Sequence, residues 1–347
     1  MLLFAVGCLV RSSTECLPYW GVTCTEVDSS PSPGDSLSGS PADSPSDSPV
    51  QVTWVAELVG KGKRYDRIQD AIVDASEGDV VLVQPGTHYE RLDFHGKGVH
   101  LLSAAGAEAT ILDGSQEGSV VEMRAMEPAT AILEGFTLTN GFGTEGHGGG
   151  VFVENADGLI QHNVFVANSA NIGGGVYLRH GYATVRNNLI LANHAAEGGG
   201  GLTCTNCKGR IEFNTFVGNS AEQGALGEWF YEPQGDLVGN VVVHDLDEVP
   251  PFAVRLMEPK GYTFEVSHNL MWPEVPWVDP GNPVAESWPV DAEVLYLDPL
   301  FVDAEAGDFR FRSGSPAIDS GPAEVLDADG GASDRGAFGG PYGDWSP

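Results

Sequence analysis

The fold of this chain is decided between Gly148 and Asn219, where the sequence reads GGGVFVENADGLIQHNVFVANSANIGGGVYLRHGYATVRNNLILANHAAEGGGGLTCTNCKGRIEFNTFVGN. Glycine triplets recur at 148–150, 173–175 and 198–200. An apolar run closed by asparagine recurs in step with them, at 165–168, 190–193 and 216–219. A fixed period of roughly 20–50 residues marks a solenoid, in which each repeat packs only on its neighbours.

The content of the repeat predicts which solenoid forms. Runs of three to five strand-forming residues are separated by Gly, Asn and Asp, about three runs in every 25 residues. Each coil then adds one strand to each of three parallel sheets, and the stack rises about 4.8 Å per coil. We expect the glycine triplets to supply left-handed turns and close backbone approach.

Asparagine marks one turn of each coil. It precedes the apolar runs at steps of 25, 26, 26 and 29 residues, at Asn163, Asn188, Asn214, Asn240 and Asn269. We predict that these side chains stack inside the solenoid, each amide bonding to the next coil. The pattern also predicts interior positions within the runs, namely Val164, Val166, Leu189, Leu191 and Val217.

The folded part begins near Val52 with a capping element. Ile68, Ala71, Ile72 and Ala75 form one apolar helix face, and a strand follows at 80–83, closed by Pro85-Gly86-Thr87. This order resembles the start of pectin-lyase-like right-handed parallel β-helices, in which the helix plugs the open N-terminal end. We therefore predict an all-β chain, a right-handed parallel β-helix of nine or ten coils with an N-terminal capping helix. Residues 135–227 also resemble the repeats of chlamydial polymorphic outer-membrane proteins, which implies a β-helical surface protein.

The N-terminal region is different in composition. Gly7-Cys8 after a short apolar run resembles the end of a bacterial lipoprotein signal, which implies a lipid on Cys8; the alternative is an accidental cysteine. The apolar run is too short to span a membrane. The residue that follows the cysteine is Leu9 and not Asp, which in the lipoprotein resemblance implies the outer membrane. Residues 9–51 are rich in Ser, Pro and Asp and read as an extended tether. The predicted organisation is a partial signal at 1–8, a tether at 9–51 and the β-helix at 52–347.

The chain closes with the run from Tyr296 to Gly339, which resembles the terminal module of many secreted bacterial β-helix proteins. We expect this module, from about residue 290 to 347, to cover the last coil.

Charge excludes one class of partner. Acidic residues outnumber basic ones by 49 to 17, for a net charge of −32. Nucleic acid needs basic surface, so it is not an expected partner. An anionic glycan would be repelled unless a divalent cation bridges the charges, and Ca²⁺ prefers the oxygen ligands that this chain supplies.

The cysteines suggest structural roles. Cys204 and Cys207 form a Cys-x-x-Cys that predicts either a disulfide or half-buried thiols, and Cys16 with Cys24 forms a second possible disulfide. A zinc site would need a second pair of ligands, which the neighbouring sequence lacks.

No catalytic motif of the pectin-lyase-like enzymes follows the N-terminal resemblance. When the coils are aligned, Glu154 and Arg179 occupy equivalent positions on successive coils, and so do Arg186 and Glu212. We interpret both as cross-coil ion pairs. We interpret His162, His180 and His194 as exposed turn residues and not as general bases.

Two groups of residues are candidate binding sites. Asp327, Asp329 and Asp334 resemble a calcium loop, with an acidic turn as the alternative. Trp229, Tyr231, Trp272 and Trp277 are candidate sugar platforms where the repeat breaks down, with coverage of the solenoid flank as the alternative. We expect these aromatic segments to share one side of the stack.

Two functions remain open from the sequence. The first is a non-catalytic, lipid-anchored monomer at the cell surface or in the periplasm that mediates adhesion or binds a polysaccharide. The second is a polysaccharide lyase or glycoside hydrolase, with Ca²⁺ as a candidate cofactor, which rests on fold class alone. A groove holding two carboxylates beside an Arg or Lys would favour the enzyme.

Overall fold

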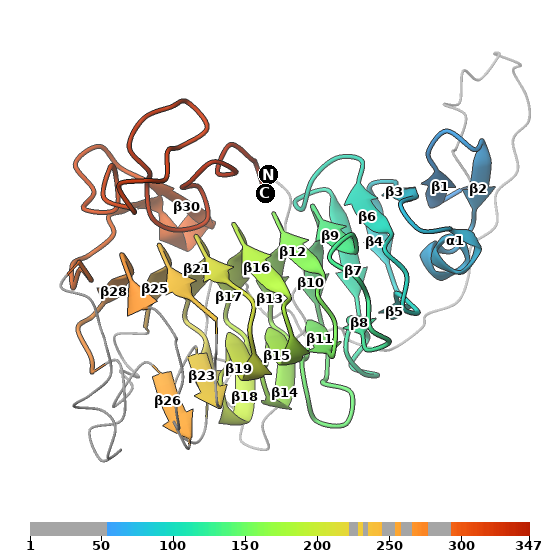
Figure 1. The fold of residues 1–347 in the computed structure, drawn as a ribbon, viewed down its shortest axis with the longest axis horizontal. Helices are drawn as coiled ribbons and strands as arrows, with labels where there is room; N and C mark the ends of the chain where they lie inside the picture. Colours follow the sequence, from blue (N-terminus) through green and yellow to red (C-terminus); the bar gives the residue numbers. More distant parts are fainter. Residues whose placement is uncertain (1–53, 222–227, 232–234, 245–253, 258–265, 277–292) are drawn as a thin grey trace, which may run out of the picture. The chain divides into compact units, whose positions relative to one another are not determined.

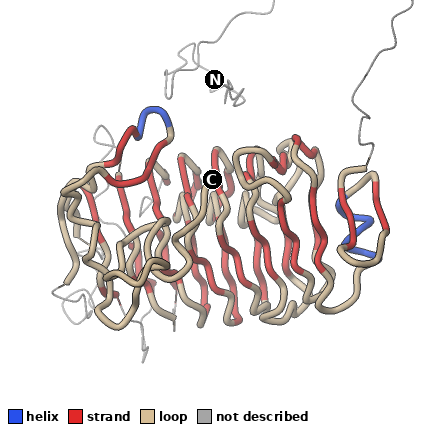
Figure 2. The backbone as a smooth tube through the Cα atoms, turned by 90° about the horizontal axis from the view of Figure 1, so that it is seen from above, coloured by secondary structure: helices blue, strands red, loops and turns tan. Residues whose placement is uncertain are grey.

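Residues about 26 positions apart lie side by side, because successive coils stack their strands in register (Figures 1 and 2). The computed structural model describes residues 54–221, 235–244, 266–276 and 293–347, together with the backbone of 228–231 and 254–257. These residues form an all-β parallel solenoid of about six turns. The expected nine or ten coils were therefore too many for the part of the chain that is described. The predicted signal and tether, with Cys8, Cys16 and Cys24, lie outside the described residues.

Three sheets make the walls of the solenoid. The first wall has ten strands: β2 (Lys63–Tyr65), β1 (Ala56–Leu58), β3 (Val80–Val83), β6 (His100–Ser103), β9 (Ile132–Glu134), β12 (Leu159–Gln161), β16 (Thr184–Arg186), β20 (Ile211–Glu212), β24 (Leu237–Val238) and β27 (Val266–Ser267). From β3 onward the strands are parallel, whereas β1 and β2 are antiparallel additions at one edge.

The other two walls are parallel throughout. The second wall has eight strands: β4 (Gly86–His88), β7 (Thr110–Asp113), β10 (Thr137–Thr139), β13 (Val164–Val166), β17 (Leu189–Leu191), β21 (Thr215–Val217), β25 (Val241–Val243) and β28 (Leu270–Trp272). The third wall has seven: β5 (Leu92–Asp93), β8 (Val121–Met123), β11 (Val151–Glu154), β15 (Val176–Gly181), β19 (Leu202–Cys207), β23 (Glu228–Tyr231) and β26 (Val254–Met257). A short fourth sheet lies between them: β14 (Ser169–Ile172), β18 (His194–Gly198) and β22 (Ser220–Ala221).

The interior of the second wall is lined by the middle residue of each strand. Leu138, Phe165, Ile190 and Phe216 are buried in the main core. The predicted interior positions were wrong by one residue. Val164, Val166, Leu189, Leu191 and Val217 flank the middle residues and face the opposite side of the wall. A shift of one position moves every side chain of a strand to the other face.

The predicted asparagine stack is confirmed. Each amide nitrogen in the series donates to the side-chain oxygen of the next, at 3.0–3.2 Å along Asn163, Asn188, Asn214, Asn240 and Asn269. A second stack runs through Asn168, Asn193 and Asn219 at 3.0 Å. All eight side chains are buried, and their amides also donate to backbone carbonyls of the preceding coil. The stacks satisfy the turn backbone inside the solenoid, where water cannot.

The glycine triplets stack on one another in the same manner. Gly149 N–H donates to Gly173 O at 3.1 Å, and Gly174 N–H donates to Gly199 O at 3.1 Å. A Cβ on Gly149 would lie 2.3 Å from the carbonyl oxygen of Gly174. Close contact between coils therefore excludes any larger residue at this position.

The predicted capping helix forms as α1 (Ile68–Asp74), the one α-helix among the described residues. Ile68, Ala71 and Ile72 are buried and belong to the main core. The carboxylate of Glu90 accepts hydrogen bonds from the first two helical N–H groups, and Lys97 donates to carbonyls of the last turn. Both contacts satisfy helix-end groups that have no partner within the helix. No helix among the described residues is long and apolar enough to span a membrane.

The C-terminal segment, residues 293–347, lies along the outer face of the second wall (Figure 1). Its hairpin of β29 (Phe301–Asp303) and β30 (Asp308–Phe311) packs Phe301 and Phe309 against Leu189, Val241 and Leu270. Only its start extends the stack, where Leu295 pairs with Leu270 of the last strand. We expected the segment to cover the last coil, and most of its described residues cover the flank instead. This contact explains why the outward-facing Leu189 is buried.

Replacing Asn188 by Ala should destabilise the solenoid strongly. The change leaves Asn163 N–H and Ile160 C=O in the core without their partner. Each unsatisfied buried group costs about 1–3 kcal/mol, so we expect the two groups together to lower the free energy of unfolding by at least about 2 kcal/mol. Urea denaturation measures it, with Asn171→Ala as the control, since Asn171 is exposed. Equal midpoints for the two variants would contradict a structural role for the stack.

Candidate functional site

A polar column crosses four coils on the outer face of the first wall. Glu134, Gln161, Arg186 and Glu212 are register partners on β9, β12, β16 and β20. The residue before each of them is buried in the core, so strand alternation turns these four side chains outward. We call these four residues the polar column.

Arg186 holds its positive charge without an acidic partner. Its Nε and Nη2 donate to Oε1 of Gln161 at 2.9 and 2.7 Å, and its guanidinium carbon lies 3.5 Å from the ring centre of Tyr342. The predicted ion pair with Glu212 was wrong, because no ion pair of Arg186 exists among the described residues. Glu212 pairs with Arg210 instead, at 3.1 Å. The guanidinium is therefore fixed in direction with a charge free to meet an anion.

Glu134 is the anionic centre of the column. Its two carboxylate oxygens contact His100 Nε2 at 2.8 Å and His162 Nδ1 at 3.0 Å. Burial acts to raise the pKa of Glu134, but hydrogen bonds from His100, His162 and Gln161 outweigh it and hold the pKa well below its usual range. Glu134 therefore remains a carboxylate at any physiological pH.

His162 is not the exposed turn residue that we expected. Its side chain is only 16% exposed, and its second nitrogen, Nε2, lies 2.8 Å from the carbonyl oxygen of Tyr342. The Trp345 ring stacks on the imidazole at a centroid distance of 5.4 Å. The C-terminal segment thus reaches past the second wall and contacts the polar column.

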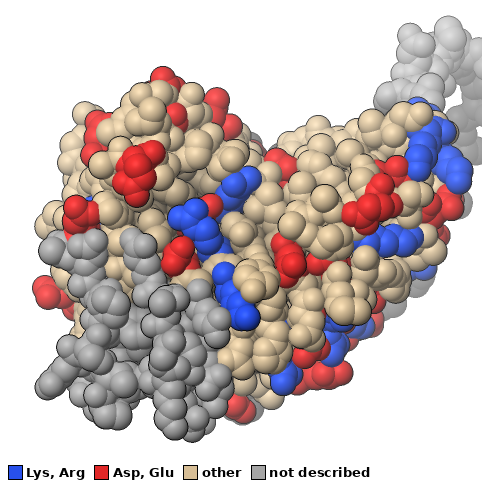
Figure 3. Space-filling view, in the orientation of Figure 1, with Lys and Arg blue, Asp and Glu red and all other residues tan. Residues whose placement is uncertain are grey.

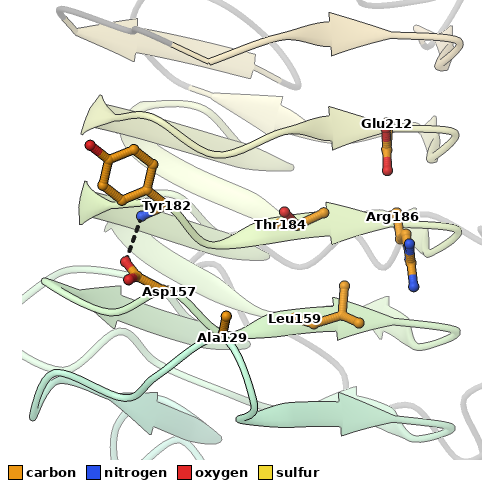
Figure 4. Close-up of a pocket in the computed structure, with 8 residues that line it drawn as sticks. Ala129, Asp157, Leu159, Tyr182, Thr184, Arg186 and Glu212 are labelled. Atoms are coloured by element: carbon orange, nitrogen blue, oxygen red, sulfur yellow. Dashed lines mark hydrogen bonds between the residues drawn. The ribbon is translucent and has the colours of Figure 1, made fainter.

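A shallow groove of roughly 340 Å³ lies beside the column, over β12, β16 and β20 (Figure 4). Tyr182 and Asp157 stand at one end of it, and Arg186 and Glu212 stand at the other. Its floor and sides are completed by Ala129, Gly158, Leu159 and Thr184. The Tyr182 side chain is 57% exposed, and its backbone N–H donates to Asp157 at 2.9 Å. The groove therefore offers an aromatic face, hydroxyl groups and charges of both signs.

Basic side chains gather at this groove although the protein is acidic overall. Lys208 Nζ lies 5.4 Å from the Tyr182 ring centre, Arg210 lies two residues further along the same coil, and Arg186 lies on the coil before. Figure 3 shows several Lys and Arg side chains, with acidic side chains among them, near the middle of the face that it draws. Arg186 lines the groove itself, and Lys208 and Arg210 lie beside its lining residues Tyr182 and Glu212.

A separate ionic cluster covers part of the third wall. Arg124 contacts Glu122, Glu145 and Glu154 at 3.2–3.4 Å. The predicted pair of Arg179 with Glu154 is present at 3.2 Å. Every cation here has a carboxylate partner, so this cluster has a structural explanation and leaves no charge for a ligand.

The predicted aromatic residues do not come together on one wall. Trp229 and Tyr231 belong to β23 in the third wall, in register with Thr203 and Thr205. Trp272 belongs to β28 in the second wall, and Trp277 lies outside the described residues. Most of the second aromatic segment lies outside the described residues, so the expectation that the two segments share one side of the stack stays a prediction.

The acidic residues of the predicted calcium loop bind backbone groups. Asp327 accepts hydrogen bonds from the N–H of Asp334 and Gly340, Asp334 accepts from Asp319, and Asp329 accepts from the turn that follows it. In the described part of the chain, no group of three or more His, Cys, Asp or Glu is arranged to hold a metal ion. Burial, together with the nearby carboxylates, raises the pKa of Asp334 to about 6.

The Cys-x-x-Cys is a disulfide. Cys204 and Cys207 are joined within β19, and both are buried in the core. The bond closes a short loop at the end of one strand and leaves no thiol for chemistry.

Comparison with known proteins adds little. No family model and no curated protein matches this chain. Among solved structures, an alginate lyase from Paenibacillus sp. str. FPU-7 is similar to 60% of this chain over 93% of its own, with 13% sequence identity and a TM-score of 0.38. A likeness at this level carries no argument about function.

Several residues of the groove were missed in the sequence. Asp157, Tyr182 and Lys208 follow one another at steps of 25 and 26, the same steps that separate the coils. Extending the column alignment beyond the asparagines would have found them. Tyr342 carries no such signal, because a contact made 156 residues away from Arg186 follows no period.

Replacing Asp334 by Asn should stabilise the protein at neutral pH. The raised pKa means that folding favours the protonated carboxyl, so the ionised form costs stability as the pH rises through about 6. The amide keeps the contact with Asp319 and removes the charge, and we expect a gain of about 1–3 kcal/mol at pH 7.5 that vanishes near pH 4. Denaturation midpoints at both pH values test this, with the exposed Asp66→Asn as the control. A loss of stability that appears only with added Ca²⁺ would restore the calcium interpretation.

Proposed function

We propose that this protein binds a polysaccharide chain with acidic substituents in the groove of the first wall, without cleaving it. The observation that supports this most is Arg186, a half-buried cation held in one direction and not paired with a carboxylate in the described structure. An arginine presents a planar fork of N–H donors that matches a carboxylate or sulfate group.

Tyr182 supplies the second contact in this proposal. Its exposed ring stands opposite Arg186, about four residues away on nearly extended chain, or roughly 13 Å. A ligand that touches both is longer than a single sugar ring. Sugar rings stack on aromatic faces, while Thr184, Asp157 and Glu212 offer hydrogen-bond partners for their hydroxyl groups. An extended glycan fits this arrangement better than a small molecule does, because the groove is shallow and open.

The acidic surface limits which glycans fit. A net charge of −32 repels a densely charged chain at long range, whereas salt screens that repulsion over about 10 Å at 0.1 M. The groove therefore suits a glycan with spaced acidic groups. A lipid on Cys8 would hold the groove at a membrane surface, and membrane fractionation of a Cys8→Ala chain tests that part of the proposal.

Arg186→Gln and Tyr182→Ala should each weaken glycan binding by about tenfold or more, since each removes a charge-assisted bond or a stacking face. Calorimetric titration with acidic and neutral oligosaccharides measures this. Arg179→Gln is the matched control, because Arg179 lies on the third wall and pairs with Glu154. Trp229→Ala tests the earlier aromatic candidate in the same assay. Retained binding in the two groove variants, with loss in Trp229→Ala, would move the site to the third wall.

Catalysis is a second candidate because the groove holds two carboxylates, Glu212 beside Arg186 and Asp157 at the opposite end. A glycoside hydrolase uses a pair of carboxylic groups on either side of the bond that it cleaves. In this groove, however, Asp157 accepts the Tyr182 N–H and Glu212 pairs with Arg210, so each has a structural partner.

We expect no release of reducing ends or unsaturated products from a panel of acidic polysaccharides, with Ca²⁺ or with a chelator. Product formation that Asp157→Asn or Glu212→Gln abolishes would establish the enzyme.

A further inference from the structure

We propose that the segment Tyr342–Trp345 is a pH-dependent latch, which closes over Arg186 when the His162 imidazole is protonated and opens when it is neutral. The latch is a property of the chain itself. Its consequence for ligands rests on the proposed function.

Both ring nitrogens of His162 face hydrogen-bond acceptors. Nδ1 faces a carboxylate oxygen of Glu134 at 3.0 Å, and Nε2 faces the carbonyl oxygen of Tyr342 at 2.8 Å. Both partners are acceptors. A neutral imidazole carries one N–H and can satisfy only one of them, whereas the imidazolium carries two. The observed geometry is therefore that of the protonated ring.

Glu134 cannot relieve this requirement by donating a proton itself. Its hydrogen bonds with His100 and His162 keep it ionised, with a pKa held well below its usual range despite its burial. A carboxylate only accepts, so Nδ1 needs its own proton to bind it.

The other groups around His162 agree with a charged ring. Across Glu134 lies His100, whose Nε2 takes the other carboxylate oxygen. The Trp345 ring covers one imidazole face at an interplanar angle of 29°, which favours a cation. Arg186 is the cation on the next coil, and its guanidinium lies over the Tyr342 ring. The Glu134 carboxylate and the rings of Trp345 and Tyr342 thus lie next to the two cationic side chains, His162 and Arg186.

Few contacts tie the latch to the first wall. Trp345 also donates its indole N–H to Ala337 at 2.7 Å and stacks on Phe338, but both belong to the same C-terminal segment. Among the described residues, Tyr342–Trp345 contacts the first wall through His162 and Arg186, and Trp345 also packs on the apolar cluster at the outer face of the second wall. Loss of the proton on His162 removes one charge-assisted bond and one cation contact from this small set.

The closed latch competes with a ligand. The Tyr342 ring covers one face of the Arg186 guanidinium, which the proposed function assigns to the acidic group of a glycan. Once the His162 ring carries only one N–H at higher pH, one of its two hydrogen bonds is lost and the closed state weakens. Opening then exposes the guanidinium, so glycan binding should tighten as the pH rises.

Hydrogen–deuterium exchange of residues 340–347 tests the latch without any glycan. After correction for the intrinsic pH dependence of exchange, we expect roughly tenfold faster exchange at pH 8 than at pH 5.5, because a hydrogen bond to a charged group is lost. His162→Asn should exchange at the fast rate at both pH values. Asn suits the left-handed backbone there (φ 56°), and its amide can still donate to Glu134 but cannot reach Tyr342.

His100→Gln is the matched control, since His100 contacts Glu134 but not the latch. It should keep the pH dependence of the wild type. Should His162→Asn fail to fold, ¹⁵N shifts of the histidine rings in the wild type still decide, because the closed state requires a ring with two N–H groups. The proposal is wrong if residues 340–347 of the wild type exchange equally fast at both pH values. It is also wrong if His100→Gln abolishes the pH dependence of exchange.

The two proposals fail in different ways. If the latch opens with pH but no glycan binds at any pH, the latch stands and the proposed function is wrong. If glycans bind equally well to the wild type and to His162→Asn at pH 5.5, where the wild type should be latched, then the latch does not control the groove.

Discussion

The hydrogen bond between one buried asparagine amide and the next fixes the register of the whole solenoid. Each side chain in the two stacks bonds to the equivalent residue of the following coil and to the backbone of the preceding one. A coil that slipped by one residue would leave several of these polar groups unpaired in the core, where each costs about 1–3 kcal/mol. Fixed register in turn puts every outward position into a column, so residues 25 or 26 apart become neighbours on the surface. The polar column and the groove beside it both follow from this constraint.

The architecture could be predicted from the sequence because the residues that fix the register recur visibly along it. Asparagines and glycine triplets recur at the coil period, and the capping helix has a complete apolar face. Which side chains of each strand point into the core could not be predicted in the same way. A run such as Val164-Phe165-Val166 is apolar at all three positions, so it does not say which side is inside. Both sides are in fact covered, one by the core and the other by the C-terminal segment. An alternation of apolar and polar residues would have decided the facing, and β10 (Thr137–Thr139) has one, whereas β13, β17 and β25 are apolar at all three positions.

The site was harder to predict for a related reason. Within the solenoid, contacts follow the period, and Asp157, Tyr182 and Lys208 could have been placed together by counting. The C-terminal segment does not repeat, so its contacts carry no spacing signal. Nothing in the sequence near Tyr342 or Trp345 indicates a partner at Arg186 or His162. Reading His162 as an exposed turn residue was reasonable from its position in the coil, and it failed because a distant segment covers that turn.

Charge explains why this small region differs from the rest of the surface. In a protein of net charge −32, most cations are expected to find a carboxylate, as Arg124, Arg179 and Arg210 do. Arg186 is held instead by a neutral amide and an aromatic ring, both of which orient the guanidinium without neutralising it. Gln161 therefore has a specific effect at its place in the column: a glutamate there would pair with Arg186 and repel Glu134, and the groove would lose its available cation. The same amide separates the anion that binds His162 from the cation that faces the groove. His162 beside the polar column thus serves the latch, and Arg186 within the column serves a ligand one coil away.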